Sequence, residues 1–178
     1  DYNIWLRSSY DGRLQQLTTD GVKNQEWTIK LFPFWESPAD VEWSPDSQRV
    51  AVGKIDLRNV LRYPLIHWLK PQEEVEWFPE AEAGGPMPQM ELFIIEVISR
   101  KIIKIHGGDL PDHFYRFLGW LSDGSELLFT RLDREFKKWE LMAADPWTGS
   151  SRVILAEAQK TFLIGHPSMP AWSNAFTL

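Results

Sequence analysis

Four histidines and one serine turn are the residues of this chain that could do acid–base or nucleophilic chemistry. A nucleophilic serine on a strand–turn–helix elbow needs a Gly-x-Ser-x-Gly pentapeptide, and the sequence contains none. The nearest segment, Gly119–Gly124, is one residue too long, and its Ser-Asp-Gly run is typical of a hairpin turn. The histidines are His67, His106, His113 and His166. None has the spacing of a metal or catalytic site, so we interpret all four as loop or surface residues.

Acidic and aromatic residues gather in residues 58–90, a segment interrupted by several prolines. The acids Glu73, Glu74 and Glu76 are typical of a solvated face. The aromatic residues Trp68, Trp77 and Phe78 either anchor the segment onto the rest of the protein or form an apolar interaction surface for substrate or a second subunit. We predict no catalytic residue, no metal and no cofactor in this chain.

The composition narrows the class of protein. The chain has 178 residues, of which 43% are hydrophobic and 25% charged, which is ordinary for a globular domain. Its formal net charge of −6 argues against nucleic acid or an anionic membrane as a partner. The absence of cysteine excludes disulfides, Cys-ligated zinc and a Cys nucleophile, but it does not fix the compartment. No apolar run approaches the roughly 18 residues of a membrane span.

Two interleaved sequence repeats predict the strands and turns on which the histidines, the serine turn and the aromatic residues lie. Residues 43–52 match residues 120–129, and each copy reads as a strand, a tight polar turn and a second strand. Residues 91–94 match residues 140–143, and residues 3–6 fit the same frame. Each of these leads through a turn into another short strand, so two types of hairpin alternate along the chain.

A hairpin of each type in succession makes four antiparallel strands. From Trp120 to Leu155 this unit is 36 residues long, close to the length of a propeller blade. We therefore predict an all-β fold: one domain over residues 1–178, made of about two and a half four-stranded antiparallel blades of a partial β-propeller. Residues 58–90 would be an irregular insert within one blade. Trp5, Trp43 and Trp120 fall at repeat positions, where we expect them to pack between blades.

Five stretches, in this order, resemble the N-terminal β-propeller region of the dipeptidyl peptidase IV family of prolyl-specific serine peptidases. They are Leu17–Gly21, Trp43–Ser47, Arg58–Ile66, Ala83–Pro86 and Ala144–Gly149. The Tyr-Pro-Leu-Ile and Ala-Gly-Gly-Pro motifs within the insert are the most specific of these. The N-terminus has neither the basic nor the apolar region of a signal peptide and reads as an internal segment.

The resemblance implies a non-catalytic propeller fragment of a larger serine peptidase. Its partners would be an α/β-hydrolase domain that carries the catalytic residues, a peptide substrate and, as a homodimer, a second subunit. The chain would shape substrate access and subunit contacts and would itself have no peptidase activity. The alternative is a stand-alone propeller-like interaction module, which would have to cover its open strand edges by binding a partner.

One family role does not transfer to a residue of this chain. The family binds the substrate α-amine with a pair of glutamates placed before the Trp-Ser-Pro-Asp hairpin, because carboxylates pair well with ammonium groups. Glu73 and Glu74 follow that hairpin, and Glu26 and Glu36, which precede it, are isolated acids. The sequence therefore identifies no amine-binding pair.

Overall fold

The computed structural model describes residues 2–28 and 41–163. Thirteen strands and no helix are found in this part of the chain, which confirms the all-β prediction. The strands are β1 (Trp5–Arg7), β2 (Leu14–Gln16), β3 (Gln25–Thr28), β4 (Glu42–Trp43), β5 (Arg49–Asp56), β6 (Arg62–Ile66), β7 (Val75–Pro79), β8 (Gln89–Glu96), β9 (Ile102–Lys104), β10 (His113–Trp120), β11 (Leu127–Asp133), β12 (Lys138–Ala144) and β13 (Ser151–Ala158).

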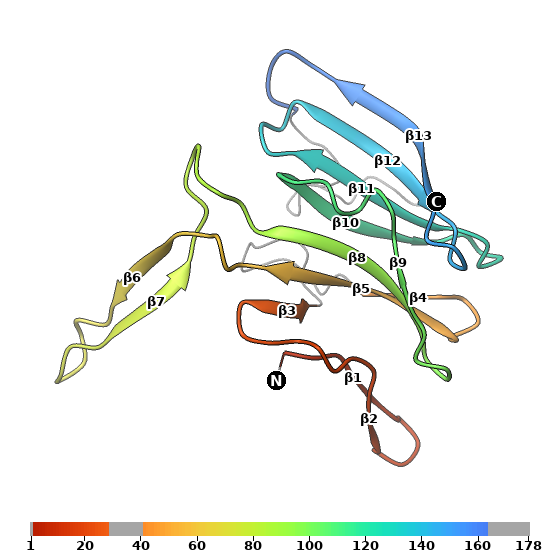
Figure 1. Ribbon diagram of the computed structural model, residues 1–178, viewed down its shortest axis with the longest axis horizontal. Coiled ribbons are helices and arrows are strands. Elements are labelled where there is room, and N and C mark those ends of the chain that lie inside the picture. The colour runs from red at the N-terminus through yellow and green to blue at the C-terminus, as the bar shows by residue number, and fades with distance from the viewer. Residues whose placement is uncertain (1, 29–40, 164–178) are drawn as a thin grey trace.

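The strands form the antiparallel blades that the repeats predict (Figure 1). The first hairpin, β1–β2, stands beside a second blade of β3, β4, β5, β8 and β9. The third blade has the order β10-β11-β12-β13, with consecutive strands as neighbours. Both predicted hairpin types are present with every turn in its expected place, and five or six residues separate the two strands of each hairpin.

The second blade contains a strand that the repeats do not reveal. Its inner edge is shared by two short strands: β3 pairs with the C-terminal half of β5, and β4 pairs with the N-terminal half. In the third blade the single strand β10 fills the whole of this edge. The residues between β3 and β4 interrupt the repeat, so comparison of the blades cannot predict β3.

Two apolar clusters join the blades face to face. Adjacent residues of β5, Val50 and Ala51, belong to different clusters because successive strand residues point to opposite faces. Both faces of the second blade are therefore buried, which explains its continuous apolar runs. The cluster against the third blade includes Ala51, Leu92, Ile94, Phe117, Phe129 and Met142. The cluster against the first hairpin includes Leu17, Trp27, Val50, Val52, Phe93 and Ile95.

Of the three tryptophans predicted to pack between blades, only Trp120 does so. It packs against the cluster between the second and third blades, and its indole N–H donates to the carbonyl of Glu42 at 3.1 Å. Trp43 and Trp5 are 42% and 44% exposed, so the prediction is wrong for both in this chain. Trp43 lies on the side of the second blade where, among the described residues, only the hairpin β1–β2 stands. Trp5 belongs to that hairpin and lies on the face opposite to Leu6, which packs against the second blade, whereas Trp120 faces a complete blade.

Hydrogen bonds from the third blade to the loop at His106 and Gly107 join the second and third blades, and we call this set of bonds the polar latch. The carbonyl of Gly149 accepts the N–H of His106 at 2.7 Å, and the hydroxyl of Ser151 donates to the carbonyl of His106. The guanidinium of Arg131 donates to the carbonyl of Gly107 at 3.1 Å and to the carboxylate of Glu140. The third blade thus holds the loop that leaves the second blade.

Glu140 makes the stability of this junction depend on pH. Burial opposes its ionisation, but hydrogen bonds from Arg131 and Lys138 outweigh burial and place its pKa below the ordinary value of 4.5. The ionised carboxylate therefore stabilises the fold above that value, and the contribution is lost as the pH falls through the lowered pKa. Glu140→Gln should cost roughly 1–3 kcal/mol at neutral pH and less in acid.

The check is a series of thermal melts between about pH 7 and about pH 3. The difference in melting temperature between the natural protein and Glu140→Gln should shrink as the pH falls. Glu126→Gln is the matched control, because Glu126 also pairs with an arginine, Arg152, whose side chain is largely exposed. A difference that stayed constant with pH for Glu140→Gln would contradict this assignment.

Candidate functional site

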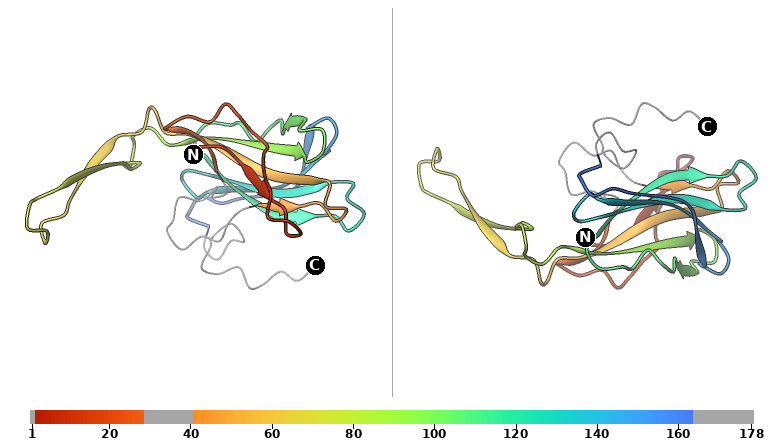
Figure 2. Two further views of the ribbon diagram at one scale, coloured as in Figure 1. Left: turned by 90° about the horizontal axis from the view of Figure 1, so that it is seen from below. Right: turned by 90° about the horizontal axis from the view of Figure 1, so that it is seen from above.

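The insert forms a hairpin arm that projects from the blades (Figures 1 and 2). Within the described residues, strands β6 and β7 pair only with each other, in an antiparallel register that runs from Arg62 opposite Pro79 to Ile66 opposite Val75. The insert is extended, as expected, and it contains one regular two-stranded hairpin, with turns and loops before, between and after its strands. Pro64 is tolerated because both strands of the arm are edge strands, where a missing N–H can face solvent.

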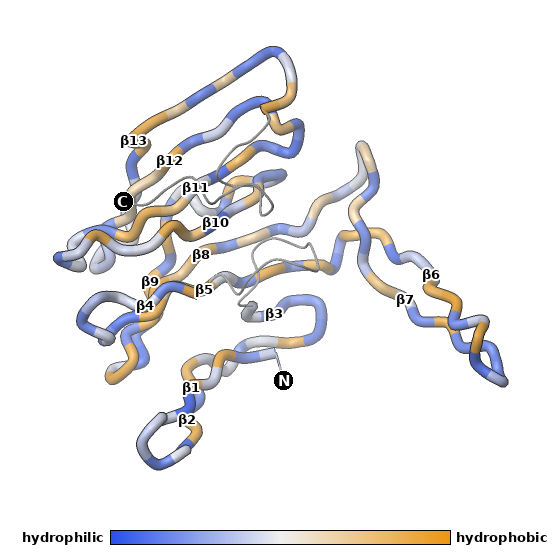
Figure 3. Tube along the Cα trace, turned by 180° about the vertical axis from the view of Figure 1, so that it is seen from behind, coloured by the Kyte–Doolittle hydropathy of each residue, from blue (hydrophilic) through white to orange (hydrophobic). Residues whose placement is uncertain are grey.

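One face of the arm is a continuous apolar surface. In an antiparallel pair, directly opposed residues lie on the same face, so Pro64 and Trp77 share a face with Ile66 and Val75. We call these four residues the apolar arm face. Trp77 is 57% exposed, and Ile66 and Val75 are about as exposed. The hydropathy coloring of Figure 3 shows hydrophobic stretches on both strands of the arm.

The arm does not bring the three predicted aromatic residues together. Trp77 belongs to the apolar arm face, whereas Phe78 opposes Tyr63 on the other face and is partly buried. Trp68 lies in the loop at the tip and is 72% exposed. Trp68 and Trp77 therefore do not anchor the insert onto the blades, which was the other interpretation of these side chains.

The charged residues of the arm pair with one another. Lys70 pairs with Glu74 across the tip loop, and His67 lies 3.3 Å from Glu76 on the face that carries Phe78. Glu73, Glu74 and Glu76 are all exposed, as expected of a solvated face. Exposed ion pairs of this kind contribute little to stability.

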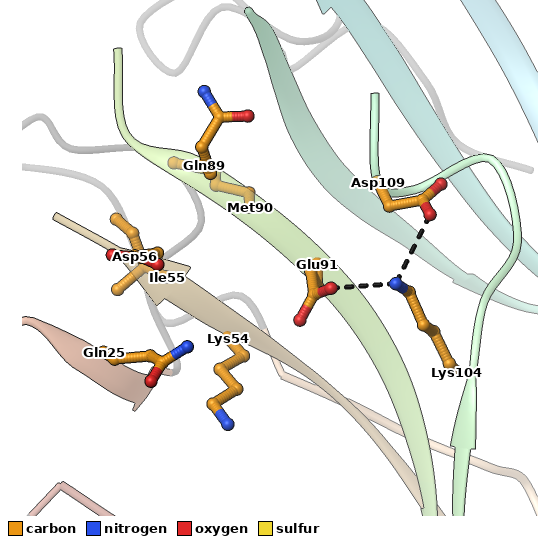
Figure 4. Close-up of a pocket in the computed structure, with 9 residues that line it drawn as sticks. All are labelled: Gln25, Lys54, Ile55, Asp56, Gln89, Met90, Glu91, Lys104 and Asp109. Atoms are coloured by element: carbon orange, nitrogen blue, oxygen red, sulfur yellow. Dashed lines mark hydrogen bonds and ion pairs between the residues drawn. The ribbon is translucent and has the colours of Figure 1, made fainter. Parts of the chain in front are cut away.

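A second candidate site is a charged cavity of about 240 Å³ on the second blade (Figure 4). The ammonium of Lys104 contacts Glu91 at 2.8 Å and Asp109 at 3.3 Å. The bond to Glu91 raises the pKa of Lys104. Burial opposes the ionisation of Asp109, but the Lys104 ammonium outweighs it and lowers the pKa of that carboxyl. Lys54 also lines the cavity and contacts Asp20 at 2.6 Å.

The repeat explains why these charges lie together. Lys54 stands opposite Glu91 in the second blade, just as Arg131 stands opposite Glu140 in the third. The third-blade pair is buried against the second blade, whereas the second-blade pair faces the short first hairpin and lines a cavity. The repeat offsets that match Lys54 with Arg131 and Glu91 with Glu140 could have identified this pair from the sequence. We interpret the cavity as a structural feature of the second blade rather than a ligand site, because its lysines already have carboxylate partners.

The remaining predicted residues do not form a reaction centre. Ser122 lies in the turn between β10 and β11, as expected. The carboxylate of Glu26 accepts the N–H of Asn24 at 3.1 Å, and Glu36 and His166 lie outside the described residues. Across residues 2–28 and 41–163, no three His, Asp or Glu side chains are placed to hold a metal ion. No helix in the same ranges has the length and apolar character of a membrane span.

Two solved structures that share this fold are described as dipeptidyl peptidases. The chain matches Porphyromonas gingivalis dipeptidyl peptidase 4 with a TM-score of 0.79 at 20% identity, covering 91% of this chain and 24% of that one. It matches a Bacteroides ovatus protein assigned as a dipeptidyl aminopeptidase IV with a TM-score of 0.75 at 18% identity, covering 90% and 25%. The chain thus spans about a quarter of the length of each. No curated protein sequence is matched significantly.

The sequence comparison reaches nearly the whole chain. Residues 1–176 match the family described as the dipeptidyl peptidase IV (DPP IV) N-terminal region. The match agrees with the resemblance that the sequence motifs indicate. This chain therefore belongs to the dipeptidyl peptidase IV N-terminal region family.

Proposed function

We propose that this chain is the non-catalytic propeller segment of a dipeptidyl peptidase IV-like serine peptidase. In this proposal an α/β-hydrolase domain of the same protein carries the catalytic residues, and the blades form part of the wall that controls the access of peptides. The observation that carries the proposal is the family match over residues 1–176. The two solved relatives are about four times as long as this chain, which supports a larger parent enzyme.

The arm is the part of the chain best suited to a subunit contact. A two-stranded hairpin is at best marginally stable in water when nothing covers it. The apolar arm face exposes Ile66, Val75 and Trp77 together, and tryptophan is enriched at the centres of protein interfaces. We assign this face to the contact between two subunits of the parent enzyme.

A stand-alone interaction module is the alternative, and the same exposed arm is the observation that favors it. The two functions differ in whether the natural protein contains an activated serine. A fluorophosphonate reagent forms a covalent bond to such a serine, so labelling by this reagent distinguishes the peptidase from the interaction module.

The expected result is that the full-length natural protein is labelled and that a polypeptide of residues 1–178 is not. Heat-denatured full-length protein controls for nonspecific reaction. A full-length protein that resisted labelling would favour the interaction module, and labelling of the 178-residue chain would contradict a non-catalytic role.

A further inference from the structure

Hydrogen bonds to the blades hold the base of the arm on both sides, where the chain enters the arm and where it leaves. On the entry side, the N–H of Leu57 donates to the carbonyl of Asn24 at 2.7 Å. The guanidinium of Arg62, the first residue of β6, donates to the side-chain oxygen of Asn24 at 2.6 Å. Asn24 has φ = 67°, a left-handed conformation that asparagine tolerates better than most residues. Its side chain is thereby aimed at the arm.

On the exit side, the contact comes from a different blade. Arg134 follows β11 of the third blade, and its guanidinium donates to the carbonyl of Gly85 at 2.9 Å. The same guanidinium lies 3.5 Å from the carboxylate of Asp112, whose backbone carbonyl accepts the N–H of Arg134 at 3.0 Å. Arg134 is therefore itself fixed at two points before it reaches the arm.

Between these two clamps the arm strands are tied to each other and to the core. The N–H of Glu80 donates to the carbonyl of Leu61 at 2.9 Å, just below the hairpin. Val60 and Met87, one on each side of the base, are buried. Beyond this point β6 and β7 have no other strand as a neighbour in the described chain. The direction of the arm is thus determined at its base and nowhere else along its length.

We propose that Arg62 and Arg134 are positioning residues that fix the direction in which the arm leaves the blades. Because one clamp belongs to the second blade and the other to the third, the arm can hold its direction only when the two blades are packed together. The consequence for subunit contact rests on the function proposed above for the apolar arm face. An arm that is held at two separate points at its base has fewer orientations available, so less conformational entropy is lost when a partner binds it.

The test measures the direction of the arm in the full-length protein. Spin labels on cysteines introduced at Leu69, in the tip loop, and at Ser125, in a turn of the third blade, report the distribution of distances between arm and blade. The double variant Arg62→Gln/Arg134→Gln should broaden this distribution about twofold. Arg152→Gln is the control, since Arg152 is a third-blade arginine that pairs with Glu126 and does not touch the arm.

A second readout separates this proposal from the proposed function. If the natural protein dimerises, the double variant should associate about tenfold more weakly, while Arg62→Gln/Arg134→Lys, which keeps a charged donor at position 134, should recover part of the loss. A natural protein that did not dimerise would contradict the role of the apolar arm face, and the distance distribution would still decide the role of the clamps. A distribution as narrow in the double variant as in the natural protein would overturn the proposal. Equal broadening in Arg152→Gln would overturn it as well.

Discussion

Replacing Gly149 with alanine is expected to destabilise the fold by roughly 3–5 kcal/mol. Gly149 ends the turn between β12 and β13 with φ = 74°, where a side chain is strained. A Cβ at this position would overlap the backbone carbonyl of Lys104 in the second blade. Backbone cannot move aside as a flexible side chain can, so the two blades would have to separate at their latch.

Gly12 provides a matched control for the strain alone. It occupies the equivalent turn of the first hairpin with φ = 71°, and the nearest atom to an added Cβ is 3.8 Å away, on the side chain of Arg7. Gly12→Ala should therefore cost only about 1–2 kcal/mol. The measurement is thermal unfolding of the full-length protein, with amide hydrogen exchange in β12 and β13 as a local readout. Equal losses for the two variants would refute the blade contact as the cause.

Replacing Trp77 with glutamate is expected to weaken the association of full-length subunits about a hundredfold without lowering the melting temperature. The indole is the largest side chain of the apolar arm face, and the arm contributes little to either apolar cluster of the blades. A carboxylate at this position would have to be desolvated when a partner covers the face. Sedimentation equilibrium of the full-length variant measures the change.

Trp147→Glu is the control for a surface tryptophan that is not on the arm. Trp147 is also about half exposed, but it lies in the turn between β12 and β13, beside Arg49. Its substitution should leave the association unchanged. If the Trp77 and Trp147 variants associate as tightly as the natural protein, the arm is not the subunit contact.

The sequence predicts the hairpins well because their signals are local. A turn such as Ser-Pro-Asp-Ser or Thr-Gly and the alternation of apolar residues around it are contained in about ten residues. Repetition of the pattern then indicates blades. The insert is also visible in the sequence, as a break in the repeat, but its pairing is not. Pro64 and Pro71 make the segment look irregular, although Pro64 fits an edge strand and Pro71 lies in the tip loop.

The features that the sequence did not predict correctly depend on contacts between distant parts of the chain. Trp43 faces the narrow first hairpin, which does not cover it, and Trp5 lies on the side of that hairpin that points away from the second blade. The strand β3 has no counterpart in the repeat, so only its pairing with β5 identifies it. The clamps of Arg62 and Arg134 join residues that are 38 and 49 positions apart, and no local pattern indicates such pairs.

The candidate site was predicted in part. Trp77 is exposed on the apolar arm face, which is consistent with an interaction surface, whereas Phe78 lies on the opposite face. Which residues share a face follows from strand register, and the register of this hairpin was not apparent from the sequence. The placement of Lys54 opposite Glu91 could have been found, because both residues fall at repeat positions that Arg131 and Glu140 occupy in the third blade.

The most direct test of a non-catalytic propeller is the release of p-nitroaniline from an X-Pro-p-nitroanilide peptide with a free N-terminus. The full-length natural protein and the polypeptide of residues 1–178 would be assayed side by side at equal molar concentration. We expect release by the full-length protein and none above background by the 178-residue chain. Release by the 178-residue chain, at a rate that follows its concentration, would contradict the account.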